Sequence, residues 1–134
     1  ARGRADAIMT AHIFNRRLDP EFPATLSKKT IAKLLRREMH FRGIVISDDM
    51  DMKAIRDEFK RETALELALK AGIDIILIAN NRFYDPDIAV TTQEMILALV
   101  AAKRVSVACI EHACRRAMEL KRRRLGTQAR GNST

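Results

Sequence analysis

The sequence contains no Trp and only one Tyr, two Cys, three Pro and five Gly among its 134 residues. With 47% hydrophobic residues, this shortage of Pro and Gly predicts one compact domain, or part of a larger one. No run of about eighteen apolar residues is present, and the first 30 residues lack the order of a signal peptide. We therefore expect a soluble, cytoplasmic unit without a membrane partner.

The two cysteines lie in a helical pattern and form neither a CxxC motif nor a Cys/His ligand spacing. Cys109 and Cys114 are five positions apart, so they point in different directions around a helix and cannot easily pair. We predict free thiols that act as small packing residues, and we expect neither a metal nor another cofactor.

The formal net charge is +8, and most of the excess lies near the C-terminus. Residues 115–134 hold seven basic side chains and one acidic one. A basic module that binds nucleic acid through the tail from Arg115 to Arg130 is therefore one alternative function. No aromatic residue is interleaved with these charges to stack on bases, and cations also favour a helix C-terminus, so we expect no nucleic-acid partner.

Apolar segments alternate with amphipathic ones along the chain. The pattern predicts strands at 7–13, 44–46 and 73–79, with a helix from the Ser27 N-cap onward and further helices at 60–71, 88–102 and 107–124. Gly72 and Ser106 supply helix stop and start signals. Apolar strands alternating with helices predict an α/β class with parallel pairing.

Three strands are few for an open sheet, and the chain begins at Ala1, almost directly on the first strand. We therefore expect part of a (β/α)₈ TIM barrel, about three parallel strand–helix units followed by C-terminal helices. A flavodoxin-like or Rossmann-like domain is the alternative, although no Gly-rich turn follows the first strand. A partial barrel would also expose apolar strand edges and helix faces.

Polar residues follow each predicted strand: His12, then Asp48 and Asp49, then Asn80 and Asn81. In parallel α/β folds the ligand site lies at the carboxyl ends of the strands. Asp48 is the strongest candidate, because a carboxylate emerging from a buried strand is costly unless it is paired or used. The alternative for Asp48 is a cap or a partner for a basic residue.

Asp48, Asp49 and Asp51 also suggest a metal-dependent α/β enzyme, although the other ligands of an EF-hand loop are missing. For His12, a packed and hydrogen-bonded histidine is as good an interpretation as a ligand contact. Asn80 and Asn81 fit a role in satisfying loop backbone groups.

Several of these segments resemble family 3 of the glycoside hydrolases, and within it the bacterial β-N-acetylhexosaminidases. Residues 6–13 resemble a strand of that family that ends in an Ala-His pair, and residues 18–27 resemble the loop after it. The most specific stretch is 41–50, with the Ser-Asp-Asp motif at Ser47, Asp48 and Asp49. Residues 71–78 and 104–125 are similar to later units of the same barrel.

The resemblance implies that residues 1–126 form the C-terminal portion of the family's barrel domain and leaves 127–134 as a disordered polar tail. The resemblance also implies that Asp48 is the nucleophile and that His12 faces the sugar of the substrate. That substrate is an N-acetylglucosaminide from cell walls or another source. In the family, a histidine and aspartate on an upstream loop act as acid and base. Nothing before Ala1 supplies them, so we expect an incomplete active site that lacks an upstream barrel segment.

Two positions depart from the family pattern. His40 stands where the family usually has Gly, and Arg42 replaces a common Asp. Both precede the strand at 44–46, on the far side from the chemistry, so they bear on turn geometry rather than on activity.

Overall fold

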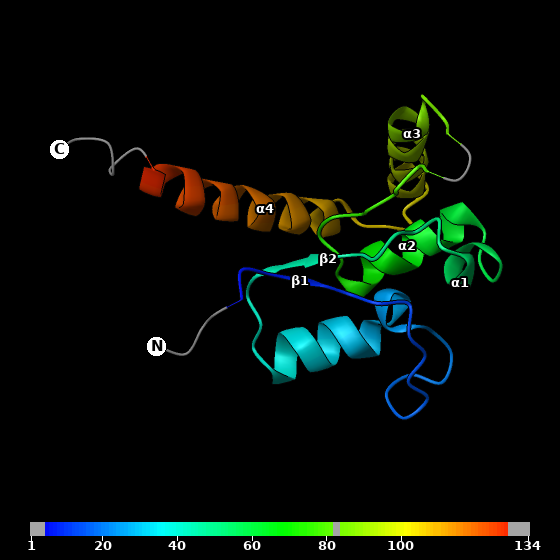
Figure 1. Ribbon diagram of the computed structural model, residues 1–134, viewed down its shortest axis with the longest axis horizontal. Coiled ribbons are helices and arrows are strands. Elements are labelled where there is room, and N and C mark those ends of the chain that lie inside the picture. Colours follow the sequence, from blue (N-terminus) through cyan, green and yellow to red (C-terminus); the bar gives the residue numbers. More distant parts are fainter. Residues whose placement is uncertain (1–4, 82–83, 129–134) are drawn as a thin grey trace.

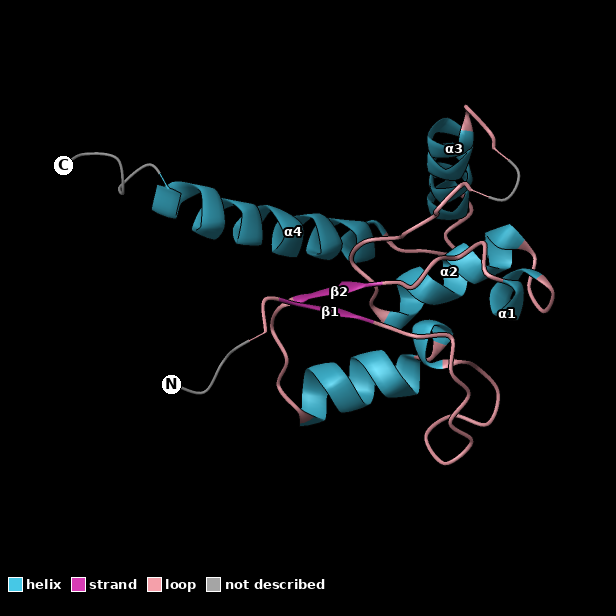
Figure 2. Ribbon diagram, viewed as in Figure 1, coloured by secondary structure: helices cyan, strands magenta, loops and turns pink. Residues whose placement is uncertain are grey.

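The computed structural model describes residues 5–81 and 84–128. Its elements follow one another in the order β1 (Ala7–Met9), η1 (Ala24–Leu26), η2 (Lys29–Glu38), β2 (Ile44–Ile46), α1 (Lys53–Arg56), α2 (Arg61–Ala71), α3 (Ile88–Ala101) and α4 (Val107–Gln128). Figure 2 shows the two strands side by side between η2 and α4, with α2 to their right in this view. The predicted α/β class is confirmed.

The two strands pair in parallel, with Ala7 opposite Ile44 and Met9 opposite Ile46. The Thr10 N–H donates to the Ile46 carbonyl at 2.8 Å and extends this pairing by one bond. β1 is therefore shorter than the predicted strand at 7–13. Within the described residues it pairs along one edge only, so no second neighbour keeps residues 11–13 in a ladder.

The prediction of a regular strand at 73–79 is wrong. This segment makes a single parallel bridge, between Ile46 and Ile75. Besides backbone bonds such as that from the Ser47 N–H to the Ile75 carbonyl, side chains accept backbone N–H groups on both sides of that bridge. The Asp74 carboxylate accepts the Val45 N–H at 2.9 Å, and the Ser47 hydroxyl accepts the Leu77 N–H at 2.8 Å. The segment still lies beside β2 in the parallel sense, which keeps the barrel-like order.

The helix signals in the sequence are largely confirmed. The Thr30 N–H donates to the Ser27 hydroxyl at 3.0 Å, as expected of an N-cap, although η2 is a π-helix. α2 ends at Gly72, whose φ of 105° is left-handed. The Cys109 N–H reaches the Ser106 hydroxyl at the start of α4. α1 was not predicted, because four residues are too few for a periodic pattern.

α2 lies at the centre of the described part of the chain and contributes to two apolar clusters (Figure 1). One cluster joins α2 to β2, η1 and η2, and includes Val45, Leu26, Ile31 and Ala68. The other joins Leu65 and Leu69 of α2 to Leu99 and Val105. No helix among the described residues is long and apolar enough to cross a membrane.

Several apolar side chains lie outside these clusters. β1 is not buried on both faces as the sequence indicated, since Met9 is 55% exposed. Ile13 and Phe14 after β1, and Val90 and Leu97 on α3, are also exposed. Apolar surface on a strand edge and on helix faces is thus present, as expected for part of a barrel. In the C-terminal region, α4 extends through Gln128, and residues 129–134 of the predicted tail lie outside the described residues.

Candidate functional site

Asp48 follows Ser47 at the carboxyl end of β2 and is half-buried. One carboxylate oxygen, Oδ1, accepts the Asp49 N–H at 2.8 Å. No basic side chain in residues 5–81 and 84–128 forms an ion pair with Asp48, so the alternative of a structural partner for a cation gains no support there. A partly shielded carboxylate without a counter-ion is suited to attack an electrophilic carbon.

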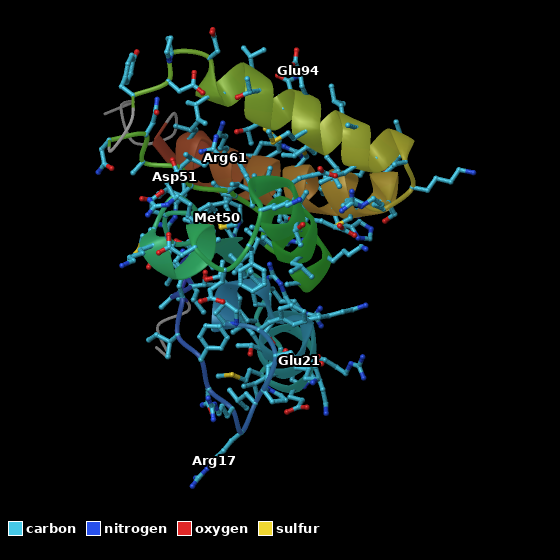
Figure 3. All side chains as sticks on the ribbon, turned by 90° about the vertical axis from the view of Figure 1, so that its right-hand side faces the viewer. Arg17, Glu21, Met50, Asp51, Arg61 and Glu94 are labelled. Carbon is cyan, nitrogen blue, oxygen red and sulfur yellow. The ribbon has the colours of Figure 1, made fainter. Side chains whose placement is uncertain are left out.

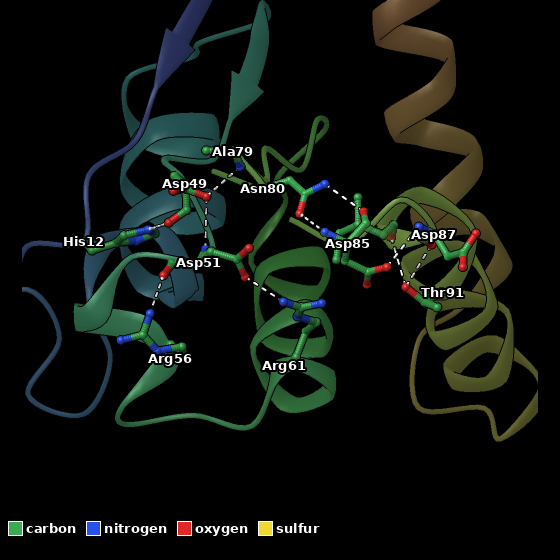
Figure 4. Close-up of polar contacts among 11 residues, drawn as sticks. His12, Asp49, Asp51, Arg56, Arg61, Ala79, Asn80, Asp85, Asp87 and Thr91 are labelled. Atoms are coloured by element: carbon green, nitrogen blue, oxygen red, sulfur yellow. Dashed lines mark hydrogen bonds and ion pairs between the residues drawn. The ribbon is translucent and has the colours of Figure 1, made fainter. Parts of the chain in front are cut away.

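Asp49 joins three segments of the site (Figure 4). Its Oδ1 accepts the Asp51 N–H at 3.1 Å and the Ala79 N–H at 2.9 Å. Its backbone carbonyl accepts a hydrogen bond from His12 Nε2 at 2.9 Å. The strand ends that the sequence predicted to converge are therefore brought together around Asp49.

His12 lies after β1 and directs Nε2 at the Asp49 carbonyl. A carbonyl oxygen only accepts, so Nε2 carries the hydrogen and Nδ1 of the neutral ring is an acceptor. Nδ1 is buried and has no hydrogen-bond partner among the described residues. His12 thus lies beside the Ser-Asp-Asp motif, and Nδ1 is the ring atom left over for a further contact.

Asn80 closes its own loop, as the simpler interpretation held. Its φ is 51°, and its side chain donates to the Asp85 carbonyl at 2.8 Å and accepts the Asp85 N–H at 2.9 Å (Figure 4). Asn81 is exposed. The Asn80 amide thus belongs to the loop that leads to α3 rather than to the group around Asp48.

The third carboxylate of the acidic cluster belongs to a surface ion pair. Asp51 pairs with Arg61 at 2.8 Å, and the two side chains lie close together in Figure 3. Arg56 donates to the Asp51 carbonyl at 3.3 Å. Since Asp49 and Asp51 have these other partners, the metal-dependent alternative gains no support. The described residues contain no group of three ligating side chains placed to hold a metal ion.

A buried carboxylate that the sequence did not single out supports the loop after β1. Asp19 is 3% exposed; it accepts the Ser27 hydroxyl at 2.7 Å and pairs with Lys29 at 3.5 Å. Burial alone would raise the pKa of Asp19, but the hydrogen bonds from Ser27 and from the Glu21 N–H, together with the Lys29 charge, outweigh it, and the pKa is lowered. The signal in the sequence was an Asp near a helix N-cap.

The opposite end of the sheet is held by another buried carboxylate, Asp74. Its side chain is 0% exposed and contacts Arg36 at 2.6 Å and Arg116 of α4 at 2.5 Å. Burial lowers the pKa of Arg36, although Asp74 acts in the opposite direction. Arg36 also donates to the Gly43 carbonyl, at the start of β2.

The basic charge of α4 is partly neutralised within the molecule. Arg116 pairs with Asp74, and Arg123 and Arg124 pair with Asp6. Cys109 packs against the second apolar cluster, whereas Cys114 is exposed, so the expected packing role is wrong for Cys114. Arg130 lies outside the described residues. No contact in the described part of the chain favours the nucleic-acid alternative.

Parallel strand–helix units with polar residues at the carboxyl ends of the strands define the class: part of an α/β barrel. The family described as "Glycosyl hydrolase family 3 N terminal domain" matches residues 2–120, and the chain belongs to that family. The resemblance stated from the motifs is therefore confirmed.

Among curated relatives, a β-hexosaminidase of Pseudomonas aeruginosa is 36% identical over 80 residues, which are 60% of this chain and 24% of that protein. A β-hexosaminidase of Glaesserella parasuis is 32% identical over 116 residues, covering 79% of this chain and 33% of that protein. The chain thus spans about a quarter to a third of the length of these relatives.

Solved structures agree on the fold. The β-N-acetylglucosaminidase of Thermotoga maritima matches 89% of this chain and 25% of its own with a TM-score of 0.79 and 33% identity. A family 3 β-N-acetylglucosaminidase of a Paenibacillus strain matches 92% of this chain and 23% of its own with a TM-score of 0.83 and 34% identity. The predicted partial TIM barrel is confirmed, while the roles of Asp48 and His12 stay predictions.

Proposed function

We propose that this chain is the nucleophile-bearing part of a retaining β-N-acetylglucosaminidase. The observation that carries the proposal is the position of Asp48, half-buried at the carboxyl end of β2, without a counter-ion among the described residues, in a member of family 3. Relatives named β-hexosaminidase and β-N-acetylglucosaminidase support the substrate class, a terminal β-linked N-acetylglucosaminide.

In the proposed reaction, Asp48 attacks the anomeric carbon and forms an ester bond to it. The bond from that carbon to the aglycone oxygen breaks, and the oxygen takes a proton from a general acid. Water, giving up a proton to the same group, then attacks the anomeric carbon and releases Asp48. Two inversions give net retention. Asp48 Oδ1 already accepts the Asp49 N–H, which leaves Oδ2 as the attacking atom.

His12 is proposed to face the sugar. Its Nε2 is engaged by the Asp49 carbonyl, so a substrate contact falls to Nδ1, which is an acceptor in the neutral ring and suits a sugar hydroxyl. Nδ1 is buried, so this contact requires the ring to move or the loop after β1 to open. His12→Phe removes the ring nitrogen proposed to meet the sugar and also the donor to the Asp49 carbonyl, so it is expected to raise KM and to lower kcat.

The general acid and base are proposed to come from an upstream barrel segment, as the family resemblance implies, and the 134 residues alone are proposed not to turn over substrate. The one-sided pairing of β1 and the exposed Met9 support this, since a further strand along β1 would cover both. The role of Asp48 and the need for this segment are separate statements and are tested separately.

The test is covalent labelling by a fluorinated, mechanism-based N-acetylglucosaminide analogue, applied to the chain alone and joined to its natural upstream sequence. We expect the joined protein to gain one sugar mass on the peptide containing Asp48. Asp48→Asn should not be labelled, whereas Asp57→Asn, a change at an exposed ion pair, should be labelled normally. Hydrolysis by a folded joined protein without an adduct on Asp48 would remove Asp48 from this role.

A further inference from the structure

We infer that Asp49 is a positioning residue that fixes the Asp48 carboxylate through the backbone of the turn after β2. The inference rests on the proposed function, because it concerns the same reaction. Asp49 directly follows the proposed nucleophile, and its N–H, its carbonyl and its Oδ1 each make a hydrogen bond that bears on where Asp48 lies.

The side chain of Asp49 holds the turn from two directions (Figure 4). Its Oδ1 accepts the Asp51 N–H at 3.1 Å, which closes the turn locally. The same oxygen accepts the Ala79 N–H at 2.9 Å, which ties the turn to a segment 30 residues further along the chain. One oxygen therefore fixes both the shape of the turn and its place beside the neighbouring strand end.

The backbone of Asp49 continues this arrangement to the nucleophile. Its carbonyl accepts the hydrogen bond from His12 Nε2 at 2.9 Å, which anchors it to the segment after β1. Its N–H donates to Asp48 Oδ1 at 2.8 Å. A shift of the Asp49 peptide group would therefore move or rotate the Asp48 carboxylate directly, and misplacement by about 1 Å costs on the order of 100-fold in rate.

The contacts of Asp49 call for an acceptor oxygen rather than for a negative charge. Both partners of Oδ1 are backbone N–H groups, and no basic side chain in the described part of the chain forms an ion pair with Asp49. Asn offers the same acceptor at the same distance from the backbone, whereas Ala removes it. This difference separates positioning from a role for the charge of Asp49.

The experiment compares Asp49→Asn and Asp49→Ala in the chain joined to its upstream sequence, with Asp57→Ala as a surface control that also removes an aspartate. The rate of covalent labelling of Asp48 by the fluorinated N-acetylglucosaminide analogue is measured against analogue concentration. We expect the maximal rate to fall on the order of 100-fold in Asp49→Ala, with half-saturation changed by less than about 3-fold. Asp49→Asn and Asp57→Ala should stay within about 3-fold of the unchanged protein.

Amide hydrogen exchange in the 134-residue chain adds a readout that needs no activity. The Ala79 and Asp51 amides should exchange faster in Asp49→Ala and stay protected in Asp49→Asn, even if Asp49→Ala is too unstable for kinetics. Equal labelling rates in Asp49→Ala and the unchanged protein would overturn the inference alone. Equal loss in both Asp49 variants would also overturn it and assign the effect to charge. Failure of the unchanged joined protein to label Asp48 would overturn the proposed function and, with it, this inference.

Discussion

At one end of β2, the Asp74 carboxylate is fully buried and contacts two arginines and a backbone N–H. At the other end, Asp48 is half-buried and accepts only the N–H of the next residue, with no arginine or lysine paired to it among the described residues. The same sheet thus carries one carboxylate whose charge is neutralised and one whose charge is left for another use. Pairing separates the structural carboxylate from the candidate nucleophile more clearly than burial does.

The largest effect is expected from Asp74→Ala, which leaves Arg36 and Arg116 without their buried partner. Removing one member of a buried ion pair costs about 3–5 kcal/mol of stability, whereas Asp48→Asn should change it by less than about 1 kcal/mol. Urea unfolding of the 134-residue chain, followed by circular dichroism, measures both. A similar loss of stability in the two variants would contradict the proposed difference between Asp74 and Asp48.

A second test concerns Gly43, which lies close to the Asp6 backbone just before β2. A Cβ on Gly43 would lie 2.4 Å from the Asp6 carbonyl oxygen, so Gly43→Ala should cost about 1–3 kcal/mol. Gly126→Ala is the matched control, because nothing lies within 4 Å of its added Cβ and α4 favours Ala there. Thermal unfolding should show a lower Tm for the first variant and an unchanged or higher Tm for the second.

Asp19→Asn tests the buried carboxylate in the loop after β1 and is expected to cost about 1–2 kcal/mol near neutral pH. The pKa of Asp19 is lowered in the folded state, so its contribution is complete above the unfolded pKa of about 3.9 and is lost as the pH falls through the folded value. The stability difference between the variant and the unchanged chain should therefore be constant from about pH 5 to 8 and shrink below about pH 4. Urea unfolding across this range would contradict the expectation if the difference grew on acidification.

The smallest effect is expected at His40, where the family usually has Gly. His40 has a φ of 55°, in the left-handed region that favours glycine. His40→Gly should stabilise the chain by up to about 1 kcal/mol, measured as a rise in the urea midpoint. Lys103→Gly, at a φ of 57° after α3, should act in the same direction. A loss of stability in both variants would mean that the side chains contribute more than the backbone conformation costs.

Helix boundaries were predictable because their signals are local. Ser27, Gly72 and Ser106 start or stop helices through contacts within a few residues, and all three act as expected. The third segment was not predictable as it stands, because the side chains of Ser47 and Asp49, 30 positions away, accept its Leu77 and Ala79 N–H groups. An apolar run alone does not show which donors its neighbours will satisfy.

The candidate site was likewise predictable from the sequence only in part. The order of polar residues after apolar strands, together with the family motif, was enough to select His12, Asp48 and Asp49 as neighbours. The particular contacts were not, since a sequence does not tell which ring nitrogen of His12 meets a carbonyl or which oxygen of Asp49 accepts two N–H groups. Asp74 was visible as the one charge in an apolar run, but its two arginines come from distant segments.

The sequence by itself determined the α/β class, the family and the residues that close each strand, because periodicity, caps and the Ser-Asp-Asp motif are local properties of the chain. Only the tertiary structure decided which carboxylates are neutralised: Asp74 by Arg36 and Arg116, Asp51 by Arg61, and Asp48 by no basic residue among those described. Ion pairs depend on distances of a few ångström between residues far apart in the chain, and folding alone sets those distances.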